Sequence, residues 1–340
     1  METIYYKIRK KLDPKFQGNL SKIAFLTKNK PIVKKDKIDP SKKFSNREKG
    51  GLIISADFEM AWAWRYTKTG FDHTQKGKIE RENFPKIIKV FEDYKIPITF
   101  ATVGHLFLES CKKGDHNWMS RIPYFDDHWK FTEGDWYDHD PHSNYKTAPE
   151  WYAPDLIQMI LDSNVNHEIG THTFTHIDFT YKNCPAQVAE DELKACMEAV
   201  KPYNIELKSM VFPGGTWGNI EILKKNGIDI YRKNVEHDLA YPWRDDQGLL
   251  VTNSSAALEY NLDYGWSSEY FLNRLKKYIN KAIETNTIAH FWFHPSLVPY
   301  LLTNLFPAFL DYATEKRERG ELWIGTMAQI ANHINQNKIL

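Results

Sequence analysis

The residues of this sequence best suited to chemistry are two histidines, His172 and His176, which stand four positions apart. They directly follow a stretch, His167 to Gly170, that is typical of the end of a strand. If the backbone turns helically after Gly170, both imidazole rings lie on one face and can converge. Two neutral imidazoles so placed can supply half of the ligands of a tetrahedral zinc site. The same spacing also occurs in ordinary loop or core histidines, so a metal site requires further residues.

A pair of acidic residues at the end of an apolar run is the second candidate. Residues 51–56 are typical of a buried strand, and Asp57 and Glu59 follow them. The two-residue period of a strand places both carboxylates on one side, at the edge where α/β proteins bind ligands. Two such charges are costly side by side unless a cation, a proton or a hydrogen bond relieves them. A surface strand end with solvated carboxylates is the alternative.

A third candidate lies late in the chain, where residues 288–295 form an apolar run that contains two histidines. In a strand, His290, Trp292 and His294 share one face, and His294 lies at the carboxyl end before a proline that stops strand pairing. We interpret His290 as a hydrogen-bonded core residue and His294 as the candidate for chemistry.

Strand and helix patterns alternate along most of the chain, and these elements must position the candidates. A helical pattern over 84–94 lies between the strand at 51–56 and a predicted strand at 96–103, which indicates a parallel βαβ unit. Further helices are predicted at 153–161, 187–200, 220–225, 271–285, 305–312 and 327–334, and further strands at 209–212 and 228–231. Residues 235–268 show no clear period. We expect one α/β domain from about residue 50 onward.

The segment from Gly114 to Trp151 has no period and is rich in tryptophan and tyrosine. A structureless loop of this length within a domain is usually functional. Aromatic faces beside carboxylates suit a sugar ring, although an insertion that packs on its own tryptophans is an equal alternative. The His and Asp residues at 126–142 could form a second metal site or the rim of a sugar pocket, and we favour the rim.

Composition excludes some classes of protein. The chain has 340 residues, with 45 Lys and Arg against 44 Asp and Glu. Residues 1–50 hold 15 basic and 5 acidic side chains, so the remainder holds 30 basic and 39 acidic ones. A nucleic-acid-binding body would not be acidic in this way. The basic extension at 1–50 is predicted to be a solvated arm, with contact to an anionic membrane surface or a phosphorylated carrier as the alternative.

The expected compartment follows from three negative observations. The cysteines, Cys111, Cys184 and Cys196, are odd in number and lack C-x-x-C spacing, which argues against a disulfide framework. No apolar run is long enough to span a membrane, and the N-terminus lacks the apolar core of a signal peptide. We expect a cytoplasmic protein, and the oligomeric state stays open.

The order of the candidate groups, an acid pair, a histidine pair and a late single histidine, resembles the polysaccharide deacetylase (NodB-homology) family of carbohydrate esterases. The resemblance covers most of residues 51–335. Residues 55–59 are similar to the first family motif, residues 168–176 to the second, and residues 291–295 to the late motif that contributes a catalytic histidine. Residues 152–156 and 322–326 also recur in cytoplasmic-type members.

The resemblance implies a fold and a division of the chain. The fold is a distorted (β/α) barrel with fewer strands than a full eight, here with a long aromatic-rich loop insertion. Residues 51–340 would form the catalytic domain, and residues 1–50 the basic N-terminal extension.

The resemblance also implies the roles of five residues. Glu59, His172 and His176 would hold a divalent metal, expected to be zinc, while Asp57 acts as general base and His294 protonates the departing amine. A backbone N–H of the turn at 213–215 would help to stabilise the oxyanion.

Two departures from the family pattern concern this acid–base machinery. The acids alternate instead of standing adjacent, so the roles of Asp57 and Glu59 could be exchanged or shared. The third motif lacks its usual arginine, which leaves Arg65, Arg232, Arg244 or no residue to orient the base.

The expected function is removal of an N-acetyl or other small N-acyl group from an amino sugar, with a metal at the site. The sugar could be nucleotide- or lipid-linked, and the setting would be the biosynthesis of a surface polysaccharide. Two alternatives stay open: a metal-independent amidohydrolase on a small cyclic or ureido substrate, and a non-catalytic glycan-binding protein with a vestigial site.

Overall fold

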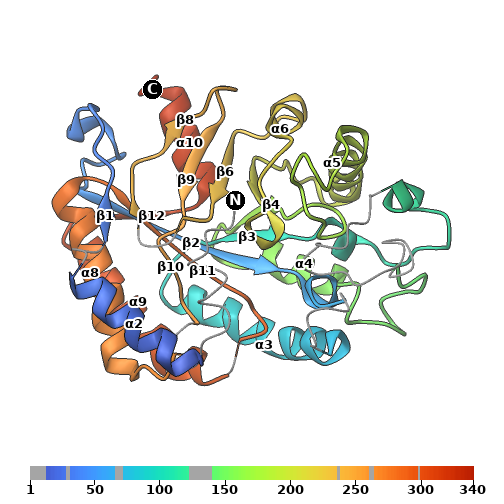
Figure 1. The fold of residues 1–340 in the computed structure, drawn as a ribbon, viewed down its shortest axis with the longest axis horizontal. Helices are drawn as coiled ribbons and strands as arrows, with labels where there is room; N and C mark the ends of the chain where they lie inside the picture. Colours follow the sequence, from blue (N-terminus) through green and yellow to red (C-terminus); the bar gives the residue numbers. More distant parts are fainter. Residues whose placement is uncertain are drawn as a thin grey trace.

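The computed structural model describes residues 13–27, 31–65, 72–121, 140–235, 238–259, 264–297 and 299–340. Its central feature is a curled β-sheet whose strands follow the order β10-β11-β2-β3-β4-β5-β6-β9-β8, with β12 also paired to β2 (Figure 1). The strands of this sheet are β2 (Gly50–Phe58), β3 (Thr99–Thr102), β4 (Glu168–Thr171), β5 (Ser209–Val211), β6 (Ile230–Lys233), β8 (Trp243–Arg244), β9 (Leu250–Asn253), β10 (Ala256–Ala257), β11 (Ile288–Phe293) and β12 (Leu322–Gly325). Among these strands the outer two, β8 and β10, do not pair with each other, so the barrel is open.

Helices surround the outside of the sheet (Figure 1). They are α2 (Pro14–Thr27), α3 (His73–Asp93), α4 (Pro154–Leu161), α5 (Ala186–Val200), α6 (Ile220–Lys225), α8 (Ser268–Thr285), α9 (Phe306–Glu318) and α10 (Met327–Gln336). Short helical turns connect them, at η1 (Pro40–Lys42), η2 (Met60–Ala63), η3 (Gly104–Phe107), η4 (Asn117–Arg121), η6 (Lys201–Tyr203), η7 (Pro213–Gly215) and η8 (Leu301–Leu305).

Strand β2 is a central strand of the sheet, and all nine of its residues are buried. It pairs in parallel with β11 on one side and with β3 on the other, and Ala56 lies opposite Phe293 while Asp57 lies opposite Ala101. Parallel strands end at the same edge of a sheet. The residues that follow β2, β4 and β11 are therefore brought to one edge.

One predicted helix begins earlier in the structure than the sequence indicates. Helix α3 starts at His73, and the carboxylate of Asp72 caps it by accepting the Gln75 backbone N–H. The predicted start at residue 84 was wrong because the first three turns are mostly polar, and the apolar period begins only at Phe84. The predicted helices at 153–161, 187–200 and 271–285 agree with α4, α5 and α8 to within three residues at each end.

The segment at 235–268, which shows no period in the sequence, contributes four short strands. Three of them, β8, β9 and β10, belong to the main sheet, in which β8 pairs with β9. The fourth, β7 (Asp238–Leu239), pairs with β1 (Ile32–Val33) in a separate two-stranded sheet. Strands of two to four residues are too short to show alternation, which explains the missing signal.

Part of the N-terminal segment packs on the body of the protein. Helix α2 lies beside α8 (Figure 1), and Phe25 on α2 is buried against the ring of Tyr278. The indole of Trp266 donates to the carbonyl of Gly18. Residues 1–12 and 28–30, which carry many of the basic side chains of the predicted extension, lie outside the described residues.

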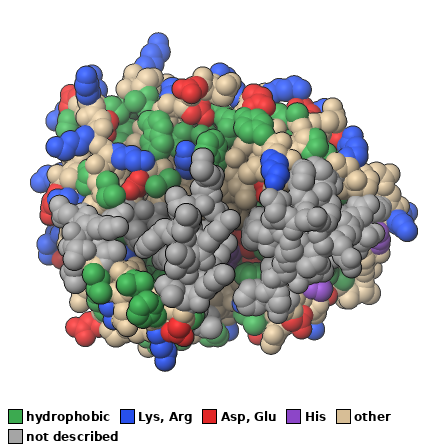
Figure 2. All heavy atoms as spheres, viewed as in Figure 1, with side chains coloured by type: hydrophobic (Ala, Val, Ile, Leu, Met, Phe, Trp, Pro, Cys, Tyr) green, Lys and Arg blue, Asp and Glu red, His purple; other side chains and the backbone are tan. Residues whose placement is uncertain are grey.

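The surface of the described chain shows neither a single sign of charge nor a membrane-crossing helix. Basic and acidic side chains are interspersed on the face in Figure 2. Within the described ranges, each helix is too short or too polar to cross a lipid bilayer.

Candidate active site

Five predicted residues, Asp57, Glu59, His172, His176 and His294, converge at the carboxyl edge of the sheet. Glu59 Oε1 lies 2.9 Å from His172 Nε2 and 3.0 Å from His176 Nε2. Glu59 Oε2 lies 3.7 Å from His294 Nε2. The ligand atoms of Asp57, Glu59 and His294 also lie within 4.8 Å of one another. The four residues other than His294 are buried, so the group forms a cluster below the surface.

The two paired histidines converge through a loop and not through the predicted helix. Strand β4 ends at Thr171, and the backbone then takes left-handed conformations at Thr173 (φ 62°) and His176 (φ 57°). Non-glycine residues adopt this region at a cost, which the surrounding contacts must offset. These two turns, and not helical spacing, bring both Nε2 atoms to the same carboxylate oxygen.

A buried carboxylate and a buried guanidinium hold this loop. Glu192 on α5 accepts the backbone N–H groups of Phe174 and Thr175, at 2.8 and 2.9 Å, and the Thr175 hydroxyl at 2.7 Å. Arg65 donates to the Thr175 carbonyl. Burial raises the pKa of Glu192, although these donors act in the opposite direction. The loop therefore has its polar backbone groups satisfied in a strained conformation.

The chemistry of the three donors fits a divalent cation. The Nδ1 atom of His172 lies 2.8 Å from the carbonyl oxygen of Val211, and because a carbonyl has no hydrogen, Nδ1 must carry the proton. In the tautomer with its proton on Nδ1, His172 directs the lone pair of Nε2 at Glu59 Oε1, which is also an acceptor. Two acceptors at 2.9 Å require a proton or a cation between them. A carbonyl partner on the remote nitrogen is also the usual way in which a metal-binding histidine is oriented.

Charges within the cluster shift the ionisation of its carboxylates. Burial alone would raise the pKa of Glu59, but the charges of His176 and His294 hold it well below its usual range. Glu80 on α3 behaves in the opposite way. Burial and the nearby charge of Glu59 raise the pKa of Glu80 to about 8, and Glu80 Oε1 accepts the backbone N–H of Glu59.

Asp57 is held by Arg232, one of the three arginines that the sequence left open. The guanidinium of Arg232 contacts both carboxylate oxygens of Asp57 at 2.7 Å and also donates to the Ser55 hydroxyl at 2.8 Å. Arg65 instead holds the loop at Thr175, and Arg244 contacts Gly248 and Asn335 at the surface. Arg232 lies on β6, two strands beyond β4, so sequence distance conceals its contact with Asp57.

His294 has a carboxylate partner that the sequence analysis missed. Glu259 Oε1 lies 2.6 Å from His294 Nδ1, and Glu259 Oε2 accepts the backbone N–H of His294 at 2.9 Å. Burial alone would lower the pKa of His294, but the charges of Glu259 and Glu59 raise it to about 10. The only signal for Glu259 is a carboxylate two residues after β10, a strand too short to be predicted.

His290 is a core residue, as the sequence indicates. It is fully buried, its Nε2 lies 2.9 Å from the Ser55 hydroxyl, and its Nδ1 lies 3.4 Å from the Thr252 hydroxyl. The Ser55 hydroxyl also accepts from Arg232, so His290 belongs to the network that supports Asp57.

The turn at 213–215 contains two glycines with positive φ, 59° at Gly214 and 70° at Gly215. Pro213 has no N–H, and the N–H of Gly215 donates to the Phe212 carbonyl. If this turn supplies an oxyanion donor, the Gly214 N–H is therefore the remaining candidate.

The aromatic-rich insertion is described only in part. Trp118 donates its indole N–H to Glu192, and Trp151 packs edge-on against Trp62, so both support the loop and the core instead of facing a sugar. Asp140 is buried against His116 and Cys111 and does not form the favoured rim. The other Trp, His and Asp residues of 122–139 lie outside the described residues.

Comparisons with known proteins confirm the resemblance. Residues 69–231 match the family model described as polysaccharide deacetylase. This range contains His172 and His176, whereas Asp57, Glu59 and His294 lie outside it. No curated protein sequence matches the chain.

Several solved structures share the fold. A protein described as a polysaccharide deacetylase from Mycobacterium smegmatis is 14% identical with a TM-score of 0.59, covering 89% of this chain and 97% of that chain. One from Pseudomonas aeruginosa PAO1 is 13% identical with a TM-score of 0.59, covering 89% and 96%. The allantoinase Puue is 13% identical with a TM-score of 0.59, covering 89% and 95%. At such identities the likeness concerns the fold alone, which is the distorted (β/α) barrel that the sequence predicts.

The match and the shared fold together support one assignment. Residues 69–231 match the polysaccharide deacetylase family, and this match, together with the shared fold, indicates a hydrolase of the deacetylase class.

Proposed function

We propose that the protein is a metal-dependent N-deacetylase that removes an acetyl or other small acyl group from the nitrogen of an amino sugar. The observation that carries this proposal is the convergence of His172 Nε2 and His176 Nε2 on one oxygen of buried Glu59. One carboxylate and two imidazoles leave a fourth position of a tetrahedral site open, which is typical of catalytic and not structural zinc. The proposed setting is surface-polysaccharide biosynthesis in the cytoplasm, which fits three cysteines that are free thiols.

Three of the residues would hold the metal, and the others would move protons. When bound, the metal supplies Lewis-acid polarisation of the amide carbonyl and lowers the pKa of water at the site. Asp57 accepts the proton of the attacking water, and the two contacts from Arg232 keep its carboxylate in one orientation. Arg232 does not reach the reacting atoms in this scheme and is a positioning residue.

His294 would donate a proton to the departing amine on the other flank of the site. Its Nδ1 proton faces Glu259, so Nε2 is the nitrogen that faces Glu59 and the open position. The pKa of His294, raised to about 10 by the two glutamates, keeps the ring protonated at neutral pH. An acid in that state is ready to protonate an amine before it leaves.

Metal content and acetate release test this proposal together. We expect wild-type protein to release acetate from an N-acetylated amino sugar, to lose activity on chelation and to regain it with zinc. His172→Ala should lose the metal of this site and reduce kcat by at least about a hundredfold. His333→Ala is the matched control, because His333 is half-buried on α10 and contacts the Lys42 carbonyl, away from the Glu59 cluster. Full activity of metal-free protein would contradict the proposal.

A second candidate function is a metal-independent amidohydrolase on a small cyclic or ureido substrate. The observation in its favour is the structural likeness to an allantoinase. Hydrolysis of such a substrate that survives chelation and His172→Ala would support it. The third possibility, a glycan-binding protein, predicts binding without turnover that Asp57→Asn leaves unchanged.

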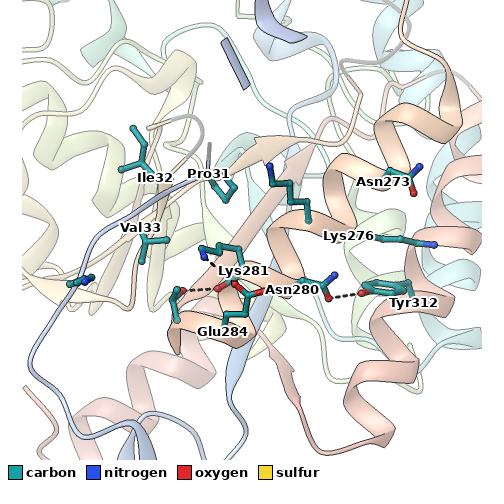
Figure 3. Close-up of a pocket in the computed structure, with 12 residues that line it drawn as sticks. Pro31, Ile32, Val33, Asn273, Lys276, Asn280, Lys281, Glu284 and Tyr312 are labelled. Carbon is teal, nitrogen blue, oxygen red and sulfur yellow. Dashed lines mark hydrogen bonds and ion pairs between the residues drawn. The ribbon is translucent and has the colours of Figure 1, made fainter. Parts of the chain in front are cut away.

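The sugar carrier is proposed to be anionic, either phosphorylated or part of a membrane surface. A groove of about 1030 Å³ lies between Pro31–Val33 and α8, and Lys35, Lys276, Lys277 and Lys281 line it (Figure 3). None of its lining residues belongs to the cluster around Glu59. Lysine heads are suited to phosphate, and each contributes about 1 kcal/mol at an anionic surface.

Binding to anionic vesicles tests the role of this groove. We expect binding to phosphatidylserine vesicles and weaker binding after Lys276→Glu with Lys277→Glu. Lys225→Glu on α6, an exposed lysine outside the groove, is the control. Equal binding of both variants would contradict the role.

A further inference from the structure

A second group of metal-ligating side chains lies apart from the Glu59 cluster. His105, Cys111, His116 and Asp140 are all buried, and one ligand atom from each lies within 4.8 Å of the others. We propose that these four residues bind a second zinc ion, with a structural role. This inference does not depend on the proposed deacetylase function, because none of the four residues belongs to that site.

The donor set is that of a closed zinc site. Two imidazoles, one thiolate and one carboxylate make four ligands and leave no open position, which is typical of structural zinc. The spacing along the chain, five residues between His105 and Cys111 and four between Cys111 and His116, puts three donors in one short segment. Asp140, which is the fourth donor, comes later in the chain, directly after the undescribed residues 122–139.

The distances are close to those of a zinc coordination sphere. Bond lengths of about 2.0–2.3 Å place two ligands of a tetrahedral zinc roughly 3.3–3.7 Å apart. Cys111 Sγ lies 3.4 Å from His105 Nε2 and 3.0 Å from Asp140 Oδ1, and His105 Nε2 lies 3.9 Å from Asp140 Oδ1. The 2.6 Å contact between His116 Nδ1 and Asp140 Oδ2 is shorter and must open by less than about 1 Å when zinc is bound.

The numbers of hydrogen-bond donors and acceptors around Cys111 Sγ also favour a bound cation over a network of side chains alone. His105 Nδ1 faces the Trp151 carbonyl at 3.3 Å and must donate to it, so Nε2 directs a lone pair at Cys111. The thiol has one proton, but His105 Nε2 and Asp140 Oδ1 both face Sγ as acceptors. A cation satisfies both acceptors and the sulfur at once. When it binds, the thiol proton leaves to solvent, and the proton between His116 Nδ1 and Asp140 Oδ2 leaves this contact for His116 Nε2 or solvent.

Two cavities lie beside the buried ligands. Asp140 lines a cavity of about 340 Å³ together with Arg65 and Trp151. His116 lines a separate cavity of about 600 Å³ together with Trp118 and Phe174. The tyrosine that also contacts Cys111, Tyr152, helps to hold the sulfur in place.

The position of the site suggests what the zinc does. The backbone N–H groups of Gly104 and His105 donate to the carbonyls of Thr173 and Phe174, at 2.8 and 3.0 Å. These carbonyls belong to the strained loop that carries His172 and His176. Zinc bound at His105 would fix the other side of this contact and so stabilise the loop.

X-ray absorption at the zinc edge tests the proposal on the intact protein. We expect wild-type protein grown with zinc to show a sulfur scatterer at about 2.3 Å. That signal should persist in the double variant His172→Ala with His176→Ala, which removes ligands of the Glu59 cluster only. A wild-type spectrum with nitrogen and oxygen scatterers alone would overturn the proposal, whatever the activity of the protein.

Cysteine variants identify the ligand. Cys111→Ser should abolish the sulfur scatterer and lower the zinc content by about one ion per chain. Cys196→Ser is the matched control, because Cys196 is also a buried free thiol but contacts Thr171. In cobalt-substituted protein, the thiolate charge-transfer absorption should likewise disappear only with Cys111→Ser. A sulfur signal that survives Cys111→Ser would overturn the assignment.

Discussion

Arg232 and Asp57 form a pair in which geometry matters more than charge. The guanidinium meets both carboxylate oxygens at 2.7 Å, and the face of Trp292 lies 5.0 Å from the guanidinium carbon. Lysine keeps the charge but has neither a planar fork nor the same reach. The orientation of Asp57 should therefore be sensitive to this substitution even where its charge is still paired.

We predict that Arg232→Lys lowers kcat by about a hundredfold, because a misplaced base loses near-attack geometry. Metal content should stay at the wild-type level, since Arg232 contacts neither Glu59 nor the two loop histidines in the described hydrogen bonds. Steady-state kinetics with parallel metal analysis measures both. Arg244→Lys at the surface is the control, and unchanged kcat in Arg232→Lys would contradict the positioning role.

The pair of His294 and Glu259 should determine how activity falls at high pH. His294 acts as an acid, so activity is present below its pKa and is lost as pH rises through that pKa, which the charge of Glu259 raises. Replacing Glu259 by Gln removes the largest charge that raises this pKa. We predict that the alkaline limb of the kcat profile moves to lower pH in Glu259→Gln, while Glu221→Gln on α6 leaves it in place. An unmoved limb would mean that another group titrates there.

At the scale of elements, the histidine loop depends on helix α5. Glu192 is fully buried and accepts from two backbone N–H groups, one hydroxyl and the Trp118 indole. Glutamine at this position would direct an amide N–H₂ at one of these donor pairs. An unsatisfied buried donor costs about 1–3 kcal/mol.

We predict that Glu192→Gln lowers the free energy of unfolding by about 2 kcal/mol and weakens metal binding at His172 and His176. Urea denaturation and metal titration measure the two effects. Glu198→Gln, an exposed residue of the same helix that pairs with Lys201, should change the free energy by less than about 0.5 kcal/mol. Equal stability of the two variants would show that the loop does not rely on α5.

At the scale of the whole molecule, the N-terminal helix α2 packs against α8. Phe25 is 5% exposed, whereas Phe16 on the same helix is 52% exposed. Arg274 lies with its guanidinium carbon 4.0 Å from the ring centre of Phe25, and Tyr278 packs on the same ring. Helix α2 thus buries one face against the body of the protein and exposes the other, although basic residues flank it in the sequence.

We predict that Phe25→Ala lowers the free energy of unfolding by about 3 kcal/mol, because it leaves a cavity against α8. Phe16→Ala should change it by less than about 0.5 kcal/mol. Thermal or urea denaturation of both variants provides the comparison. Since helix α2 contributes no residue to the Glu59 cluster, kcat at a permissive temperature should stay unchanged in both. Equal stability of the two would mean that α2 is only loosely attached.

The sequence by itself indicated the resemblance to polysaccharide deacetylases, the α/β class and the main groups that meet at the sheet edge. Strand periodicity alone places Asp57 with Glu59 and puts His294 at a strand end, because parallel strands share an edge. Tertiary structure decided which arginine meets Asp57, which carboxylate meets His294 and how His172 and His176 converge. These contacts join residues 35 to 175 positions apart through strands of two to four residues and left-handed turns. Such short elements have no period to detect, so only the folded chain brings Arg232, Glu259 and Glu192 to the site.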